Sequence, residues 1–223
     1  MMNKGKTKAA LFDLDGTLVD SLQDIANAMN EVLQHRHFDT HPLEAYNTFV
    51  GDGMEELIRR VLPTEIEPCS RLIEAMVLEM KTAYALHWRE HAFPYAGIRE
   101  MLAALIASDI RVGILSNKPD DFVREMVAFV FPEIKFETVR GVTVGGPIKP
   151  SPDGAIAILA DWGLEPSEVL YVGDTNTDMA TGKNSGMFTM GVTWGFRDRA
   201  ELESSGADQV VESPAEIVEW LLR

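Results

Sequence analysis

Two aspartates stand two residues apart directly after a short apolar run near the start of the chain. The run is residues 9–12, and Asp13 and Asp15 are followed at once by Gly16 and Thr17. A bounded apolar run of this length is typical of a buried strand, and alternation along it would put both carboxylates on one side. Carboxylates that close repel each other and need a cation or a proton between them. A solvated Asp-Gly turn, with Gly16 allowing a sharp bend, is the alternative interpretation of this stretch alone.

Three later segments carry polar groups at predicted strand ends or helix starts. In chain order they supply Ser116 and Asn117, then Lys149, then Asp174 and Asp178. Taken singly, each has a plainer interpretation as a helix cap, a strand-to-helix turn or a solvated lysine. Ligands of parallel sheets bind beyond the carboxyl ends of the strands, so the consistent placement favours one shared site.

Phosphoryl transfer is the chemistry that would use all of these groups. Asp13 would attack phosphorus as the nucleophile and form an aspartyl-phosphate. Asp15 would protonate the leaving alkoxide and then deprotonate the water that cleaves the intermediate. Lys149 would balance charge on the nucleophile and the phosphate. Three hydroxyl and amide side chains are expected to hydrogen-bond the phosphoryl oxygens: Thr17, Ser116 and Asn117.

The oxygen-rich residues of this set predict a magnesium site, because Mg²⁺ prefers hard oxygen ligands. The candidate ligands are Asp13, the backbone carbonyl of Asp15, Asp174, and Asp178 either directly or through water. The formal net charge of −15 argues against nucleic acids and anionic membranes as partners. An anionic substrate therefore needs a locally positive site, which a divalent cation and one or two lysines would create.

Length and composition indicate one large domain or a domain with an insertion. The chain has 223 residues, of which 46% are hydrophobic and 25% charged, as in ordinary globular proteins. No apolar run approaches the roughly 20 residues of a membrane helix. The single cysteine, Cys69, fits a reducing cytosol and is expected to be a small buried or half-buried side chain rather than a nucleophile. We therefore expect a cytoplasmic protein, either a monomer or a homodimer.

The pattern after residue 93 predicts an α/β fold. Strands and helices alternate there, which indicates a parallel sheet with helices on both faces. The expected strands are 9–12, 112–115, 136–139, 169–172, 188–192 and 209–211. The expected helices are 98–106, 122–130, 152–162, 178–185 and 214–222.

Residues 20–92 contain no convincing strand and predict a helical insert. Their first helix would begin at Ser21, with Ser21 and Asp24 as a capping box. We therefore divide the chain into a core of residues 1–19 and 93–223 and a cap of residues 20–92. The cap would close over a small substrate and supply specificity through the break at Gly51, Asp52 and Gly53. Three nearby histidines are expected in an exposed loop rather than in a metal site: His35, His37 and His41.

Four segments together resemble the motifs of the haloacid dehalogenase-like hydrolase superfamily: DLDGT, LSNKP, the lysine of IKPSPD, and VGDTNTD. The resemblance implies a Rossmann-like fold, Mg²⁺ and an aspartyl-phosphate mechanism, and the insert is similar to the superfamily's small helical cap. The segments DSLQDIANAMN, FVGDGMEELIRRVL, FPYAGIREML and ADQVVESPAEIVEWL resemble phosphoglycolate phosphatases more loosely. The loop from Trp194 to Arg197 departs from that pattern, which leaves the substrate open.

Phosphoglycolate is the leading candidate substrate, and several alternatives stand beside it. Within the superfamily they are a sugar-phosphate phosphatase, a pyrophosphatase and a phosphomutase. A mutase would want a cap arginine near Gly53, where the sequence has Met54. Dehalogenation would not use Asp15, and phosphonate hydrolysis would need a cap lysine, for which the insert offers only Lys81 within a helical stretch. A phosphate-binding protein without turnover is the alternative from a different class.

Overall fold

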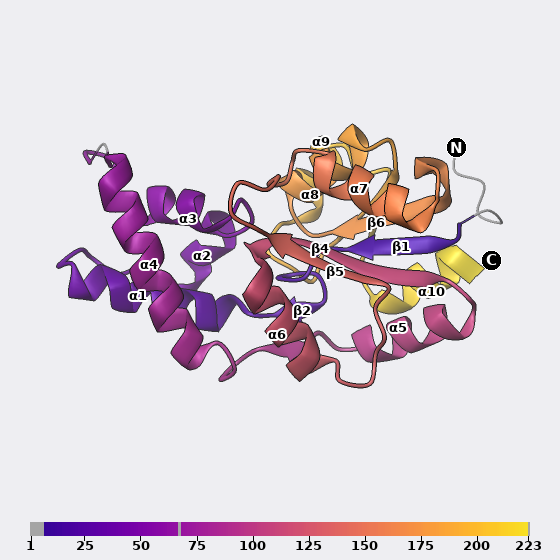
Figure 1. Ribbon diagram of the computed structural model, residues 1–223, viewed down its shortest axis with the longest axis horizontal. Helices are drawn as coiled ribbons and strands as arrows, with labels where there is room; N and C mark the ends of the chain where they lie inside the picture. Colours follow the sequence, from indigo (N-terminus) through magenta and orange to yellow (C-terminus); the bar gives the residue numbers. More distant parts are fainter. Residues whose placement is uncertain (1–6, 67, 223) are drawn as a thin grey trace.

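The computed structural model describes residues 7–66 and 68–222, and a six-stranded parallel sheet runs through it (Figure 1). The strand order is β5-β4-β1-β6-β7-β8. Their bounds are β1 Ala9–Phe12, β4 Arg111–Pro119, β5 Thr138–Val142, β6 Val169–Gly173, β7 Phe188–Val192 and β8 Gln209–Val211. The chain builds outward from β1 in both directions, as in a Rossmann-type sheet. The order reverses between β1 and β6, and ligands bind at such a point.

Helices cover both faces of the sheet, so the central strands have no polar face. On one face lie α7 (Asp153–Trp162), α8 (Asn176–Asn184) and α9 (Arg199–Ser204), and on the other α5 (Ile98–Ala107), α6 (Asp120–Val130) and α10 (Pro214–Leu222) (Figure 1). A 3₁₀ turn at Pro166–Glu168 precedes β6.

The side chains of β1 alternate between two apolar cores. Ala9 and Leu11 belong to the cluster that includes Trp162 of α7, whereas Ala10 and Phe12 belong to the cluster on the opposite face. All four are fully buried, which explains why the first strand reads as a continuous apolar run.

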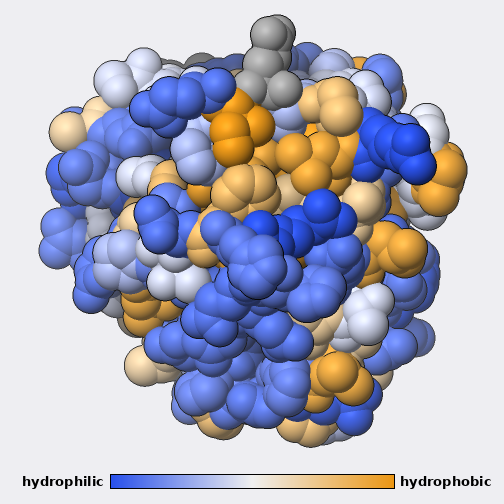
Figure 2. Space-filling view, turned by 90° about the vertical axis from the view of Figure 1, so that its left-hand side faces the viewer, coloured by the Kyte–Doolittle hydropathy of each residue, from blue (hydrophilic) through white to orange (hydrophobic). Residues whose placement is uncertain are grey.

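Four helices between β1 and α5 form a group of their own beyond the carboxyl end of β1 (Figure 1). They are α1 (Leu22–His35), α2 (Leu43–Phe49), α3 (Met54–Val61) and α4 (Ser70–His87). The chain enters and leaves this group through β2 (Val19–Asp20) and β3 (Phe93–Pro94), which pair antiparallel. Figure 2 views the molecule from the end with these helices, whose surface is largely hydrophilic with apolar residues gathered toward its upper part.

The predicted fold class is confirmed, and the local differences have physical causes. The strand expected at 136–139 lies at Thr138–Val142, because Phe136 leaves the sheet and packs edge-on against the Phe131 ring, 5.8 Å away. Helix α9 and the β2–β3 pair were not predicted. Among the described residues no helix is both long and apolar enough to cross a bilayer.

The predicted capping box at the start of α1 is wrong. The Ser21 hydroxyl donates to Asp15 and accepts from no backbone N–H of the helix, and both carboxylate oxygens of Asp24 accept from the His91 backbone N–H. Partners distant in sequence thus replace the local cap.

The three histidines His35, His37 and His41 do not converge. His41 is half-buried, contacts the Phe49 ring edge-on and lies 2.8 Å from the Val61 carbonyl oxygen through Nε2, which corrects its expected exposed position. His35 and His37 are exposed, as expected. In the described part of the chain the histidines therefore form no metal-binding group, and only three aspartates do.

Candidate active site

Asp13 lies at the centre of the sheet edge where the strands end. Its backbone N–H donates to the Val172 carbonyl of β6 at 2.9 Å, so the β1–β6 pairing continues to this residue. The side chain is buried, with 6% of the residue exposed. Its position at the reversal of strand order places it within reach of groups from β4, β6 and the loop before α7.

Three buried carboxylates converge there. Asp13, Asp174 and Asp178 each offer an oxygen, and these oxygens lie within 4.8 Å of one another. The first follows β1, the second follows β6, and the third belongs to the first turn of α8. Three acidic groups so close favour a bound cation, because otherwise their charges repel.

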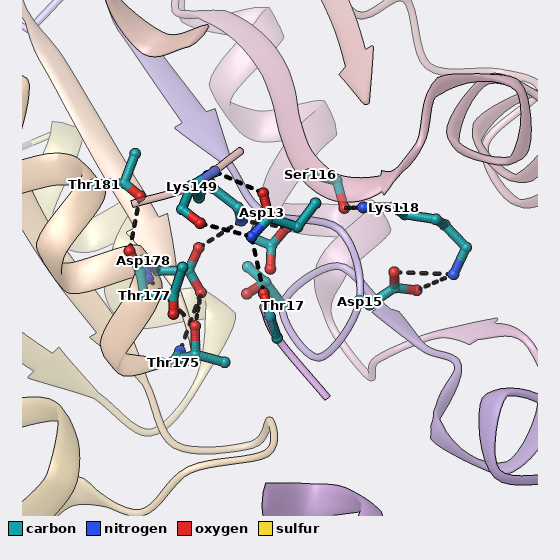
Figure 3. Close-up of polar contacts among 12 residues, drawn as sticks. Asp13, Asp15, Thr17, Ser116, Lys118, Lys149, Thr175, Thr177, Asp178 and Thr181 are labelled. Carbon is teal, nitrogen blue, oxygen red and sulfur yellow. Dashed lines mark hydrogen bonds and ion pairs between the residues drawn. The ribbon is translucent and has the colours of Figure 1, made fainter. Parts of the chain in front are cut away.

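Lys149 joins two of these carboxylates. Its Nζ lies 2.8 Å from Asp13 Oδ1 and 2.7 Å from Asp178 Oδ1 (Figure 3). The Asn117 amide fixes the lysine backbone, accepting from Lys149 N at 2.7 Å and donating to Lys149 O at 3.0 Å. Asn117 thus positions the lysine, and its expected contact with phosphoryl oxygens stays a prediction.

Asp178 has a second role in the capping box of α8, whose N-cap residue is Thr175. Its Oδ2 accepts from the Thr175 N–H at 3.1 Å and from Thr175 Oγ1 at 2.7 Å, while Thr175 Oγ1 accepts in return from the Asp178 N–H. The Tyr171 hydroxyl lies 3.3 Å from Oδ1. Both carboxylate oxygens therefore have donors already, and binding of a metal by Asp178, directly or through water, stays a prediction.

Asp174 is held by donors from two sides. Thr17 Oγ1 donates to its Oδ1 at 2.8 Å, and the Phe196 N–H donates to its Oδ2 at 2.8 Å. Gly16, at φ +84°, passes so near that a Cβ there would lie 2.7 Å from Asp174 Cγ. A Cβ at Gly195 would lie 2.5 Å from Asp174 Oδ2. Two glycines thus let the first turn and the 194–197 loop close around this carboxylate.

The electrostatics of the cluster show an excess of negative charge. Burial, together with the neighbouring Asp178, raises the pKa of Asp13 from 3.8 to about 7. Burial and the same neighbour also raise the pKa of Asp174 well above its ordinary value. Burial alone would lower the pKa of Lys149, but Asp13 and Asp178 outweigh it and the pKa lies well above the usual range. The lysine therefore stays charged, and the carboxylates need further positive charge.

The three carboxylates of Asp13, Asp174 and Asp178 are suitable ligands for Mg²⁺. All candidate side-chain ligands are hard oxygens. Asp13 Oδ1 is buried and, among the described residues, has no aligned hydrogen-bond donor besides the ion pair with Lys149. A divalent cation would satisfy that oxygen and offset the repulsion that raises both aspartate pKa values.

The Asp15 carboxylate pairs with Lys118 and not with the group around Asp13. Its two oxygens lie 2.8 and 2.9 Å from Lys118 Nζ, and Ser21 donates to one of them. Figure 3 shows this pair apart from the group around Lys149. The strand ends at Phe12, so strand alternation no longer applies at Asp15, three residues later. The Asp15 carboxylate is therefore not in the metal-binding group, and its backbone carbonyl stays the predicted ligand.

A pocket opens between these residues and the helical insert. Its free volume is about 70 Å³. Core residues on its wall include Asp13, Asp15, Ser116 and Lys118, and residues from the insert include Ile25, Val50, Gly51, Gly53, Met54, Leu57, Met80 and Tyr84. Met80 and Tyr84 of α4 belong to the hydrophobic core and also line the pocket.

Residues 51–53, the loop predicted to supply specificity, have two different roles. Gly51 and Gly53 line the pocket, and Gly51 O accepts from Asn117 Nδ2 at 3.1 Å. The Asp52 carboxylate instead binds Thr177 of α8 and Arg60 of α3. The predicted site residues thus fall into an Asp13–Lys149 group, an Asp15 group and this loop.

Sequence reasoning missed several residues at the site. Lys118 follows the predicted Ser116 by two positions, so its place on the same strand end was a usable signal, and its N–H donates to Ser116 Oγ at 3.2 Å. Tyr84 lies one helical turn after Met80, but spacing alone does not separate a pocket wall from a core. Arg197 and Thr177 gave no signal, because their partners lie in the distant insert.

Comparison with known proteins assigns the class. The family model described as haloacid dehalogenase-like hydrolase matches residues 10–192. The chain belongs to this family, which confirms the predicted family and the predicted enzyme class.

Within the family the chain resembles phosphoglycolate phosphatases. It is 30% identical over 222 residues to the phosphoglycolate phosphatase of Chromobacterium violaceum, with 99% of each chain covered. It is 29% identical to that of Aquifex aeolicus, with 96% of each covered. The crystal structure of a predicted phosphoglycolate phosphatase from Haemophilus somnus superposes with a TM-score of 0.88 at 25% identity, covering 96% of this chain and 97% of that one. CbbY from Rhodobacter sphaeroides, solved with phosphate, shares the fold with a TM-score of 0.81 at 22% identity, covering 97% of this chain and 100% of that one.

Proposed function

We propose that this chain is a magnesium-dependent phosphatase that hydrolyses a small phosphomonoester through an aspartyl-phosphate on Asp13, with phosphoglycolate as the leading substrate. The observation that carries the proposal is the placement of Asp13. It lies at the strand-order reversal, 2.8 Å from Lys149, beside the carboxylates of Asp174 and Asp178. Carboxylate nucleophile, fixed cation and metal-binding oxygens are what phosphoryl transfer requires.

Each residue has a defined part in the proposed reaction. An Asp13 oxygen bonds to phosphorus as the bond from phosphorus to the ester oxygen breaks. The leaving alkoxide takes a proton from Asp15. Water then gives a proton back to Asp15 and attacks phosphorus, which releases phosphate and restores the Asp13 carboxylate. Thr17, Ser116 and Asn117 are the proposed contacts to the phosphoryl oxygens.

Mg²⁺ would be held by Asp13, Asp174 and the backbone carbonyl of Asp15, with Asp178 as a direct or water-mediated ligand. When bound, it supplies positive charge that offsets the charge building up on the phosphoryl group. Lys149 adds a second positive charge at a fixed place, because Asn117 holds its backbone at 2.7 and 3.0 Å.

We also propose that residues 20–92 act as a cap over a core of residues 1–19 and 93–223. The support is the pocket, whose walls come from both parts and whose free volume of about 70 Å³ suits a leaving group of a few heavy atoms. Gly51 and Gly53 border it, whereas Asp52 would act by holding the loop in place. A closed cap excludes bulk water from the intermediate.

The substrate proposal rests on the relatives named phosphoglycolate phosphatase and on the small pocket. Sugar-phosphate phosphatase, pyrophosphatase and phosphomutase activities are the competing proposals. We further propose a cytoplasmic location, and a monomer or a homodimer.

A panel of phosphate esters with Mg²⁺ tests the function. We expect phosphoglycolate to rank first by kcat/KM, and Asp13→Asn to release no phosphate from any ester. Soaking beryllium fluoride with magnesium should place the fluoride complex on the Asp13 oxygen. If no ester is hydrolysed above the Asp13→Asn background, the protein is a phosphate-binding module instead.

A further inference from the structure

A lysine from the core and a tyrosine from the helical insert meet in the pocket. Lys118, near the end of β4, places its Nζ 4.6 Å from the centre of the Tyr84 ring on α4. Both residues line the pocket that contains Asp13. Lys118 is the only cationic side chain among the described residues on the wall of this pocket.

Lys118 is a buried charge with one ionic partner among the described residues. Its side chain is 6% exposed, and its Nζ is paired with the Asp15 carboxylate. Burial alone would lower the pKa of this lysine, but Asp15 outweighs it and the pKa lies above its ordinary value. An ammonium has three N–H donors, so pairing with one carboxylate does not exhaust it.

The Tyr84 hydroxyl is buried and makes no well-aligned hydrogen bond with any described residue. The Lys118 ammonium interacts with it but is itself a donor, so the tyrosine O–H has no acceptor there. An edge contact with Phe122, at 5.2 Å between ring centres, fixes the orientation of the ring. Burial raises the pKa of Tyr84 to about 12, so the hydroxyl keeps its proton. Buried polar groups in native proteins are nearly always paired, so this hydroxyl points to a missing ligand.

We infer that Lys118 and Tyr84 form a subsite for a carboxylate carried by the leaving group of the substrate. This inference depends on the proposed phosphatase function and specifies which residues would recognise the substrate. The carboxylate would accept from Lys118 Nζ and from the Tyr84 hydroxyl, and so bridge the core and the insert.

The surroundings favour a carboxylate over a second phosphoryl group. Much of the wall near Tyr84 is apolar, with Ile25, Leu57 and Met80, and the free volume of the pocket is about 70 Å³. A short methylene link and a compact, singly charged group fit such a wall better than a larger dianion, which would need more donors than one lysine and one hydroxyl.

Binding of the substrate carboxylate at this subsite would also affect the Asp15 carboxylate, because both pair with Lys118. To reach a leaving oxygen, the Asp15 carboxylate has to leave Lys118, and a buried ammonium without an anion is unfavourable. A substrate carboxylate on Lys118 replaces that partner. An ester without the carboxylate offers no replacement, so it should react more slowly even when it is bound.

A matched pair of esters tests the subsite. The pair is phosphoglycolate and 2-hydroxyethyl phosphate, which are similar in size but differ in the carboxylate. The wild-type ratio of kcat/KM should favour phosphoglycolate. Tyr84→Phe should lower that ratio about tenfold, the effect of one hydrogen bond to a charged group. Lys118→Met should lower this ratio of kcat/KM further. Any effect of the substitution on Asp15 that is the same for both esters cancels in the ratio.

Tyr46→Phe is the matched control, because Tyr46 is a second buried tyrosine of the insert, outside the pocket, whose hydroxyl donates to Asn30 at 2.8 Å. It should leave the ratio unchanged. The inference is overturned if the wild type shows no preference for phosphoglycolate, if Tyr84→Phe and Tyr46→Phe give the same ratio, or if fructose 1,6-bisphosphate is a better substrate than phosphoglycolate. Should Tyr84→Phe fail to fold, the wild-type ratio and Lys118→Met decide.

If the proposed phosphatase function is wrong, neither ester releases phosphate in the presence of Mg²⁺, which distinguishes this outcome from a wrong subsite. Calorimetric binding of the two esters to the wild-type protein and to Lys118→Met then still tests the subsite, since the carboxylate ester should bind more tightly only when Lys118 is present. Equal binding of the two esters to the wild type would overturn it.

Discussion

Arg197 of the core donates from Nη2 to the Val50 carbonyl oxygen of the helical insert at 3.0 Å. The arginine is buried, its Nη2 also lies 3.4 Å from Thr48 O, and its Nε bonds to Glu201 at 3.1 Å. Val50 lines the pocket. A residue that follows β7 therefore holds the loop that closes the pocket, and the 194–197 loop connects this contact to Asp174 through the Phe196 N–H.

Replacing this arginine should loosen the loop without touching the reacting groups. For Arg197→Gln we expect amide hydrogen exchange in residues 48–53 to become about tenfold faster or more, because lost hydrogen bonds lower the free energy of local opening. KM should rise more than kcat falls. Hydrogen exchange with mass spectrometry and steady-state kinetics measure the two effects.

Arg199→Gln serves as the control for that variant. Among the described residues Arg199 forms ion pairs with two exposed glutamates, Glu203 and Glu212, and exposed pairs contribute little. Its exchange pattern and kinetics should match the wild type. Equal exchange in residues 48–53 for both variants would contradict the role of Arg197.

The two aspartates of the first motif should fail at different steps. Asp13→Asn should abolish turnover and leave no phosphoprotein, because the amide is not a nucleophile. Asp15→Asn should abolish turnover of alkyl phosphates yet still accept phosphate from para-nitrophenyl phosphate, whose leaving group needs no proton. Intact-protein mass spectrometry detects the adduct. An unmodified Asp15→Asn protein with normal magnesium binding would argue against these assignments.

The metal-free protein should lose stability as the pH rises. The pKa of Asp13 is raised from 3.8 to about 7 in the folded chain, mainly by burial. Between these values the folded state keeps a proton that the unfolded state releases, so the folded state is favoured at low pH and Tm should fall from about pH 4 to pH 7.

Mg²⁺ should flatten that pH dependence. The cation stabilises the ionised carboxylates and binds only the folded site, so Tm at pH 7 should rise with its concentration. Scanning calorimetry with EDTA and with Mg²⁺ measures both curves, and Asp174→Asn should weaken the response. A metal-independent Tm at pH 7 would count against a magnesium site.

Gly195→Ala should damage the site through its backbone contacts. The added Cβ would lie 2.5 Å from Asp174 Oδ2, so either Asp174 or the loop has to move. We expect a loss of activity of about 100-fold or more, the scale of losing one electrostatic contact in catalysis. Gly145→Asn is the control, since at Gly145 an added Cβ meets nothing within 4 Å and asparagine tolerates a positive φ. Similar losses in both variants would mean that packing at Asp174 is not the cause.

The sequence alone determined the sheet, the helical insert and the residues of the Asp13 group. Strands that are buried on both faces, such as β1 and β6, appear in the sequence as continuous apolar runs. The parallel arrangement brings the carboxyl ends of these strands together. Asp13, Lys149 and Asp174 could therefore be expected at one place before any coordinates were known. Short-range patterns carry this information because each strand and its following turn are local in the chain.

The tertiary structure decided which charged groups pair with which. Asp15 turns to Lys118, Asp52 binds Thr177, and Arg197 reaches Val50, each across more than a hundred residues. Such pairings depend on the orientation of the helical insert relative to the sheet. The hydrophobic periodicity of the sequence does not determine that orientation. For the same reason Tyr84 could be placed on the buried side of α4 by its spacing, while its position in the pocket wall depends on the packing of α4 against the core.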